Sequence, residues 1–119
     1  MSKNILCVDD SVVLLNLIKL LLEQAGYTAV AARNGGAALS MAGGKSFVAM
    51  VIGVKPADDN GMMLTNFLMH HHRGVPVIVY SAKEMAQANS VKLLALGAHK
   101  FIQKCNGLEL VNAVKELCP

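Results

Sequence analysis

Two adjacent carboxylates, Asp9 and Asp10, directly follow a short apolar run near the start of the chain. Acids at the end of a buried strand can supply the oxygen ligands that a hard cation such as Mg²⁺ prefers. Taken alone, such a pair is more typical of a solvated turn with an acid that caps the next helix. Its chemistry therefore depends on which other side chains the fold brings to the same place.

Two further polar side chains follow apolar runs later in the chain. Ser81 comes after residues 75–80, where its hydroxyl could donate to a phosphoryl oxygen or simply cap the following helix. Lys104 comes after residues 99–103, where its ammonium could neutralise a phosphate or pair with the two acids. A lone surface lysine is usually a solvated charge, so only the combination of these residues indicates a site.

The elements that would position these side chains alternate between apolar runs and helical periods five times. A wholly apolar run such as residues 5–8 is typical of a strand buried on both faces. The first helix is predicted to be capped by Ser11 and ended by Gly26. The predicted strands span residues 5–8, 28–32, 47–52, 75–80 and 99–103, and the later predicted helices span about 34–42, 62–71, 84–96 and 108–117.

Five strand–helix units with short connections predict an α/β, doubly wound fold, in which one parallel sheet has helices on both faces. The flavodoxin-like strand order 2-1-3-4-5 suits a sheet of five strands. In that order ligands collect at the carboxyl ends of the strands, near the point where the strand order reverses. The acid pair, the hydroxyl and the ammonium are therefore expected to meet at one edge of the sheet.

Length and composition limit the classes of function. The 119 residues, of which 54% are hydrophobic, predict one domain spanning residues 1–119 with its own core. No apolar run reaches the roughly 18 residues of a membrane span, and no secretory signal begins the chain, so a cytoplasmic protein is expected. A net charge of +3 with 4% aromatic residues does not favour nucleic-acid binding. The three cysteines are expected to be reduced thiols.

Along essentially its whole length the chain resembles the receiver domains of two-component response regulators, the chemotaxis-type single-domain members in particular. Each matching stretch is weak by itself, whereas seven of them in this order with these gaps are specific. The stretches are ILCVDDS at residues 5–11, LEQAGY at 22–27, ARNG at 32–35, VPVI at 75–78, YSA at 80–82, LGA at 96–98 and FIQK at 101–104.

The resemblance implies roles for individual residues. Asp9 and Asp10 match the magnesium-binding acids of the family, and Ser81 matches the hydroxyl residue that contacts the phosphoryl group. Lys104 matches the family's lysine, and Phe101 matches the aromatic switch whose rotamer couples to that hydroxyl. A plain packed aromatic without a switching role is the alternative for Phe101.

One position departs from the family pattern. Receiver chemistry uses a carboxylate at the end of the third strand, which attacks phosphorus and becomes an acyl phosphate. Counting back eight residues from the loop glycine Gly61 reaches Gly53, and the register of the loop proline would instead place Ile52 there. Neither residue is a nucleophile, and no Asp or Glu occurs between Glu23 and Asp58.

Loss of this acid predicts a degenerate receiver that binds Mg²⁺ only weakly, has no enzymatic activity and acts as a phosphorylation-independent adaptor. The expected partners are signalling proteins, such as a histidine kinase or a downstream effector, and the chain is expected to be a monomer or homodimer without an output domain. The surface formed by residues 84–96, the fifth strand and the last helix is the expected contact. On the predicted helix the small or aliphatic residues are Ala86, Ala88, Val91, Leu94 and Ala95.

Two alternatives remain open at this point. A substitute acid, Asp58 or Asp59, could accept a phosphoryl group from a histidine kinase, although in-line attack tolerates little misplacement. The space left by Gly53 could instead hold a small ligand. Three consecutive histidines at residues 70–72 are expected to form a solvated helix end, because neighbouring helix residues point in different directions.

Overall fold

The computed structural model describes residues 3–44, 46–54, 70, 74–81, 91, 94–95, 97–103 and 107–118. Within them, five parallel strands form one sheet in the order β2-β1-β3-β4-β5, as predicted. The strands are β1 (Asn4–Val8), β2 (Thr28–Ala32), β3 (Ala49–Gly53), β4 (Val77–Ser81) and β5 (Lys100–Gln103). The bounded helices are α1 (Val12–Gln24), α2 (Gly35–Gly44) and α5 (Gly107–Leu117).

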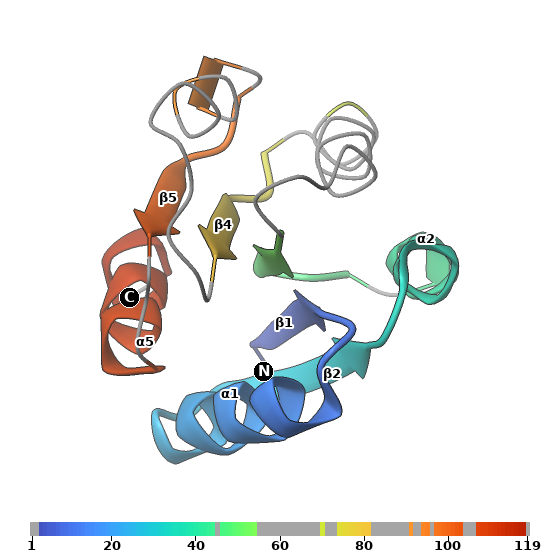
Figure 1. The fold of residues 1–119 in the computed structure, drawn as a ribbon, viewed down its shortest axis with the longest axis horizontal. Helices are drawn as coiled ribbons and strands as arrows, with labels where there is room; N and C mark the ends of the chain where they lie inside the picture. Colours follow the sequence, from blue (N-terminus) through green and yellow to red (C-terminus); the bar gives the residue numbers. More distant parts are fainter. Residues whose placement is uncertain are drawn as a thin grey trace.

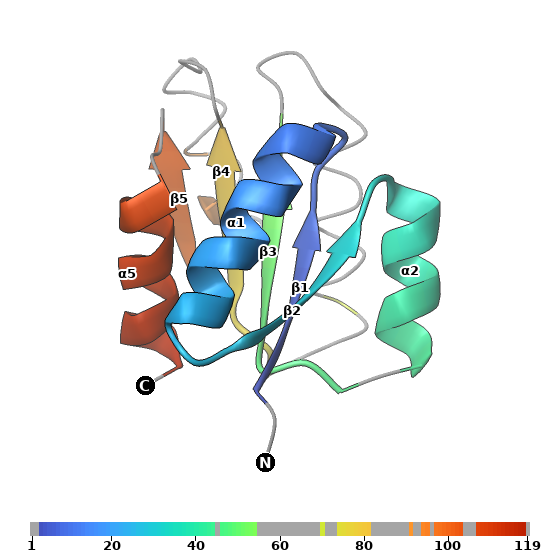
Figure 2. The same ribbon diagram turned by 90° about the horizontal axis from the view of Figure 1, so that it is seen from below.

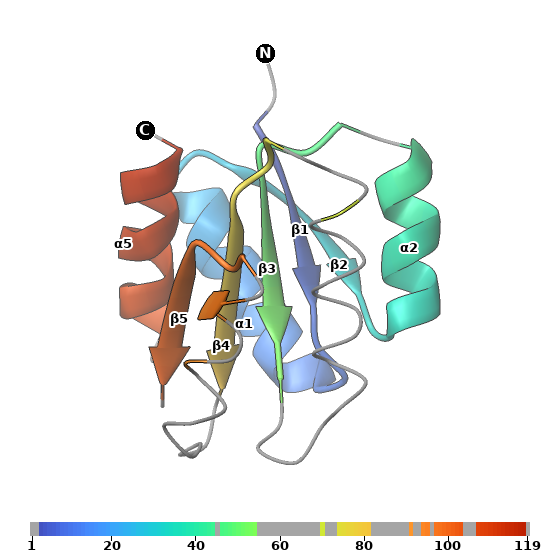
Figure 3. The same ribbon diagram turned by 90° about the horizontal axis from the view of Figure 1, so that it is seen from above.

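The described helices lie on both faces of the sheet. Figure 1 looks roughly along the strands and shows α1 and α5 on one side of the sheet and α2 on the other. Figures 2 and 3 show the same arrangement from opposite directions. Helix α1 lies in front of the strands in Figure 2 and behind them in Figure 3. Each face has its own buried apolar cluster, as a doubly wound sheet requires.

Helix α1 begins and ends where its sequence predicts. The hydroxyl of Ser11 accepts a hydrogen bond from the backbone amide of Leu14 at 3.2 Å, which satisfies one of the free amides of the first turn. Gly26 has a φ of 98°, a left-handed conformation that glycine adopts without strain, and it ends the helix. Among the described residues, no helix is both long enough and apolar enough to cross a bilayer.

Strands β3 and β4 each end one residue later than the sequence predicts. The parallel ladder continues through Gly53, which pairs with Tyr80, and through Ser81, which pairs with Gln103. A glycine and a serine look like turn residues in the sequence, whereas the backbone hydrogen bonds of a ladder do not depend on the side chain.

The helix predicted at residues 62–71 lies almost wholly outside the described residues, and the one at 84–96 is described at residues 91, 94 and 95, which are helical.

Strand register arranges side chains in rows across the sheet. Cys7 pairs with Val51 and Val51 pairs with Ile78, and all three side chains are fully buried. These three residues, the core row, pack with residues of α1 and α5 in one cluster. Paired residues of neighbouring strands project from the same face, so the residues two positions further along each strand also face α1 and α5.

Candidate functional site

Three residues at the carboxyl ends of β1, β3 and β4 form a second row, which we call the edge row: Asp9, Gly53 and Tyr80. Gly53 pairs directly with Tyr80. Asp9 follows Val8, whose partner in β3 is Ile52, so Asp9 lies level with Gly53. The edge row thus lies two residues beyond the core row on the same face of the sheet.

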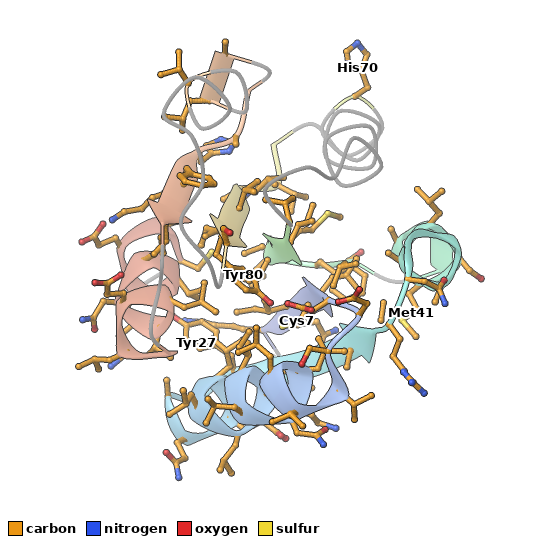
Figure 4. All side chains as sticks on the ribbon, in the orientation of Figure 1. Cys7, Tyr27, Met41, His70 and Tyr80 are labelled. Carbon is orange, nitrogen blue, oxygen red and sulfur yellow. The ribbon has the colours of Figure 1, made fainter. Side chains whose placement is uncertain are left out.

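The hydroxyl of Tyr80 donates a hydrogen bond to Oδ2 of Asp9. Tyr80 is only 1% exposed, and it projects from β4 inside the molecule, on the side of the sheet that faces α5 (Figure 4). The other carboxylate oxygen of Asp9, Oδ1, accepts the backbone amide of Ser11 at 2.9 Å. Both oxygens of Asp9 are therefore engaged by groups of the protein itself.

Gly53 lies between these two side chains, without space for a side chain of its own. A Cβ placed on Gly53 would overlap with Oδ2 of Asp9 and would lie 2.8 Å from both the Cζ atom and the hydroxyl oxygen of Tyr80. The structure does not support the alternative that the space left by Gly53 holds a small ligand, because Tyr80 fills that space.

The structure distinguishes Gly53 from Ile52, the alternative position for the missing nucleophile. Ile52 is fully buried and packs in the cluster on the opposite face, with Val8 and Val79. Gly53 is the residue of β3 that faces Asp9. Of these two positions, only 53 lies on the same face of the sheet as Asp9.

The other described residues of the predicted site lie outside the edge row. Ser81 is fully buried at the end of β4 and, as the residue after Tyr80, points to the opposite face. Phe101 is partly buried and packs against the cluster on that face. Asp10 is exposed at the start of the turn that leads to α1. Lys104, Asp58 and Asp59 lie outside the described residues.

Two other predicted features are resolved in part. His70 is exposed and projects away from the sheet, as predicted for a solvated helix end (Figure 4), while residues 71 and 72 lie outside the described residues.

Cys7 and Cys118 are free cysteines, as predicted. Cys7 lies in the core row beneath Asp9, and its burial raises the pKa of the thiol to about 12, which keeps it protonated and unreactive at neutral pH.

Comparison with known proteins agrees with this architecture. Residues 5–115 match the family described as the response regulator receiver domain. The chain belongs to this family. It is a two-component signalling receiver domain with the CheY-like, flavodoxin-like arrangement of strands and helices.

Three relatives illustrate the range of similarity. Response regulator GtcR of Aneurinibacillus migulanus is 32% identical over 116 residues, which cover 97% of this chain and 47% of GtcR. The CheY-like receiver domain protein of Methanospirillum hungatei JF-1 is 29% identical, with a TM-score of 0.87 over 98% of this chain and 93% of that one. TrrA of Thermotoga maritima, solved in complex with Mg(2+)-BeF, is 24% identical with a TM-score of 0.82 over 97% and 98% of the two chains, which shows the fold alone.

The chain spans less than half the length of the curated relatives it matches. Those relatives are a probable transcriptional regulatory protein of Picosynechococcus and GtcR. The likeness therefore concerns only a part of each of them.

Receiver domains commonly bind Mg²⁺, but the edge row of this receiver domain does not fit the ion. Mg²⁺ takes carboxylate and water oxygens in a near-ideal octahedron. Gly53 supplies no side-chain oxygen, and Oδ2 of Asp9, the oxygen that faces Gly53, accepts a hydrogen bond from the hydroxyl of Tyr80. Among the described residues, no group of three metal-ligating His, Cys, Asp or Glu side chains occurs.

Sequence reasoning missed Tyr80 as a site residue. It appeared only as the last apolar residue of a strand, because a tyrosine at a strand end is most often a packed aromatic. A usable signal was present in the register: the residue two positions after Ile78 lies opposite Gly53 once the three strand ends are aligned. The contact with Asp9 joins residues 71 positions apart and is visible only in the structure.

Proposed function

We propose that this receiver domain is an atypical one that binds signalling partners independently of phosphorylation. One observation carries the proposal: the residue of β3 that faces Asp9 is a glycine, and a tyrosine hydroxyl fills the space beside it. Phosphoryl acceptance needs an oxygen nucleophile in line with the phosphorus atom. Glycine has none, and a buried tyrosine already bonded to a carboxylate is not placed to replace it.

The proposed contact surface combines the helical segment around Val91 and Leu94 with β5 and α5. Val91 and Leu94 are 57% and 46% exposed, although both are large apolar side chains. Exposed apolar side chains beside charged ones are typical of surfaces that bind other proteins. Lys100 of β5 and Glu116 of α5 form an ion pair at 2.6 Å on this surface. A hollow of about 390 Å³ lies there, lined by Lys100, Phe101, Ile102, Glu109, Asn112 and Ala113.

The partner is proposed to be a signalling protein, either a histidine kinase or a downstream effector. Receiver domains generally act in signalling without being enzymes themselves, through contacts with kinases and effector domains. A receiver that cannot be switched by a phosphoryl group can still present a partner-binding surface, because the fold and that surface do not depend on the acceptor. The proposed role is accordingly constitutive binding by a monomer or homodimer.

Intact-mass measurement after incubation with acetyl phosphate and MgCl₂ tests the absence of phosphoryl acceptance. The expected result is an unchanged mass, while a receiver domain with a carboxylate at the corresponding position gains a phosphoryl group in a parallel reaction. A stoichiometric adduct on this chain would contradict the proposal. If that adduct mapped to Asp58 or Asp59, a substitute acid would be the acceptor.

A capture experiment tests the contact surface. The wild-type domain and a Val91→Asp/Leu94→Asp variant are immobilised, and the proteins that each retains are identified by mass spectrometry. A signalling protein retained by the wild type, with or without acetyl phosphate, should be lost with the variant. Equal retention by both would place the contact elsewhere, and retention only with acetyl phosphate would contradict phosphorylation independence.

A further inference from the structure

We propose that Tyr80 replaces the side chain that Gly53 lacks: its hydroxyl occupies the space of the missing acid, bonds Asp9 in place of a cation and thereby closes the pocket. This inference deepens the proposed function and rests on its assignment of position 53 to the missing acceptor. Gly53 and Tyr80 then form a matched pair, in which the glycine is required because the tyrosine is present.

The first support is the burial of Tyr80. A hydroxyl removed from water needs a hydrogen-bond partner, because an unsatisfied buried polar group is destabilising. Tyr80 is 1% exposed, and its hydroxyl finds that partner in Oδ2 of Asp9. An ionised acceptor makes this a charge-assisted hydrogen bond, which is stronger than a bond between neutral groups. The hydroxyl of Tyr80 thus gives the carboxylate of Asp9 a partner from within the protein, in place of a cation from solvent.

The second support is the steric relation between positions 53 and 80. The backbones of Gly53 and Tyr80 are paired in the sheet, so neither residue can move away without breaking the ladder. Any side chain at position 53 begins with a Cβ, and that atom would lie 2.8 Å from Cζ of the Tyr80 ring. Because the ring is fully buried, it has little room to give way. An acid at position 53 and a tyrosine at position 80 are therefore incompatible in this backbone.

The third support is the way in which Asp9 is held. Its Oδ1 accepts the amide of Ser11, and the hydroxyl of Ser11 in turn accepts the amide of Leu14 at the start of α1. With Tyr80 on Oδ2, one chain of hydrogen bonds runs from the end of β4 to the first turn of α1. A cation that binds Oδ2 of Asp9 from the side of Gly53 has to displace a buried tyrosine, so we expect Mg²⁺ affinity to be low.

Thermal melting of a four-protein cycle tests the matched pair. Gly53→Ala is expected to lower the melting temperature of the wild type by about 5 to 10 °C, the usual effect of overpacking in a domain of this size. In a Tyr80→Val background, the same change should be neutral or raise the melting temperature, because the clashing ring is gone and Oδ2 of Asp9, which the Tyr80 hydroxyl no longer holds, can turn away from the new Cβ. Gly43→Ala is the control, since a Cβ on Gly43 meets nothing within 4 Å. The same loss in both backgrounds, or none in the wild type, would overturn the inference.

Nuclear magnetic resonance provides a test that does not depend on the folding of the Tyr80→Val variant. The buried hydroxyl of Tyr80 should give a slowly exchanging proton signal that is absent from Tyr80→Phe and unchanged by millimolar MgCl₂. Loss of that signal from the wild type on addition of MgCl₂ would show that the ion displaces the tyrosine, which contradicts the inference.

Calorimetric titration with MgCl₂ separates this inference from the proposed function. Gly53→Asp alone should give no saturable binding, whereas Gly53→Asp/Tyr80→Val should bind Mg²⁺ saturably, because the acid then has space beside Asp9. Equal binding by both variants would contradict the role inferred for Tyr80. It would not bear on the proposed function, which predicts that the wild type forms no phosphate adduct. An adduct on the wild type would instead overturn the proposed function.

Discussion

The core row and the edge row lie two residues apart on the same face of the sheet, yet different forces hold them. In the core row, Cys7, Val51 and Ile78 are fully buried and contribute through packing. In the edge row, a carboxylate, a glycine and a tyrosine hydroxyl are held by hydrogen bonding and a close steric fit. The fold therefore depends on the core row, whereas the chemistry of a receiver depends on the edge row, which can change without loss of the fold.

If packing alone holds the core row, truncating one of its side chains should lower the free energy of unfolding more than any other substitution described below. Ile78→Ala should lower the free energy of unfolding by about 3 to 4 kcal/mol, the usual cost of removing a fully buried aliphatic side chain. Urea denaturation followed by circular dichroism measures this. Val13→Ala, at a side chain that is 81% exposed, is the control and should change stability by less than about 0.5 kcal/mol. A loss at Ile78 as small as that of the control would be inconsistent with a packed row.

In the edge row, removal of one hydroxyl should have a smaller but specific effect. Tyr80→Phe should lower the free energy of unfolding by about 1.5 to 3 kcal/mol, because it removes a hydrogen bond to a charged group. Tyr27→Phe is the matched control, since the hydroxyl of Tyr27 donates to the neutral carbonyl of Cys118 at 2.5 Å. The control should lose only about 1 kcal/mol. Equal losses in the same urea denaturation measurements would argue against a charged acceptor for Tyr80.

Cys7 of the core row should also make the free energy of unfolding depend on pH in the alkaline range. Burial raises the pKa of Cys7 from 9.0 to about 12, so the folded chain keeps a proton that the unfolded chain releases above pH 9. The stabilisation is fully present below pH 9 and is lost as the pH rises toward 12, by about 1.4 kcal/mol per pH unit. Denaturation of wild type and Cys7→Ala across this window measures the difference, in which the other titrating groups cancel. Parallel pH profiles would contradict a buried thiol.

Outside both rows, the exposed ion pair of Lys100 and Glu116 should contribute least. The two side chains are 40% and 65% exposed, so solvent screens their attraction. A double-mutant cycle with Lys100→Met and Glu116→Gln should give a coupling energy below about 0.5 kcal/mol, smaller still at high salt. A coupling above about 1 kcal/mol would show that β5 and α5 are joined by more than their apolar contacts.

Most of the fold could be predicted from the sequence because its signals are local. The apolar run of β1, the cap of α1 by Ser11 and the left-handed Gly26 each reflect neighbouring residues only. The strand order followed from the number of strand–helix units. The sequence predicts the ends of β3 and β4 one residue too early. Gly53 pairs with Tyr80 and Ser81 pairs with Gln103, and these pairings depend on the neighbouring strands.

The site was predicted only in part, for a different physical reason. The absence of a carboxylate from the end of β3 is a property of composition and could be read directly. What fills the resulting space depends on the contact of side chains from three strands, and Tyr80 and Asp9 are 71 residues apart. The sequence therefore indicated that an acid is missing, whereas only the structure shows that a tyrosine takes its place beside Asp9.

A crystal structure of the wild-type chain, grown with MgCl₂ and beryllium fluoride, would show whether Tyr80 or a cation occupies the space beside Asp9 and Gly53. The predicted result is the hydroxyl of Tyr80 on Oδ2 of Asp9, with no magnesium or beryllium fluoride beside Gly53. The contradictory result is Mg²⁺ bound to Asp9 and Asp10, with Tyr80 turned out of the space next to Gly53.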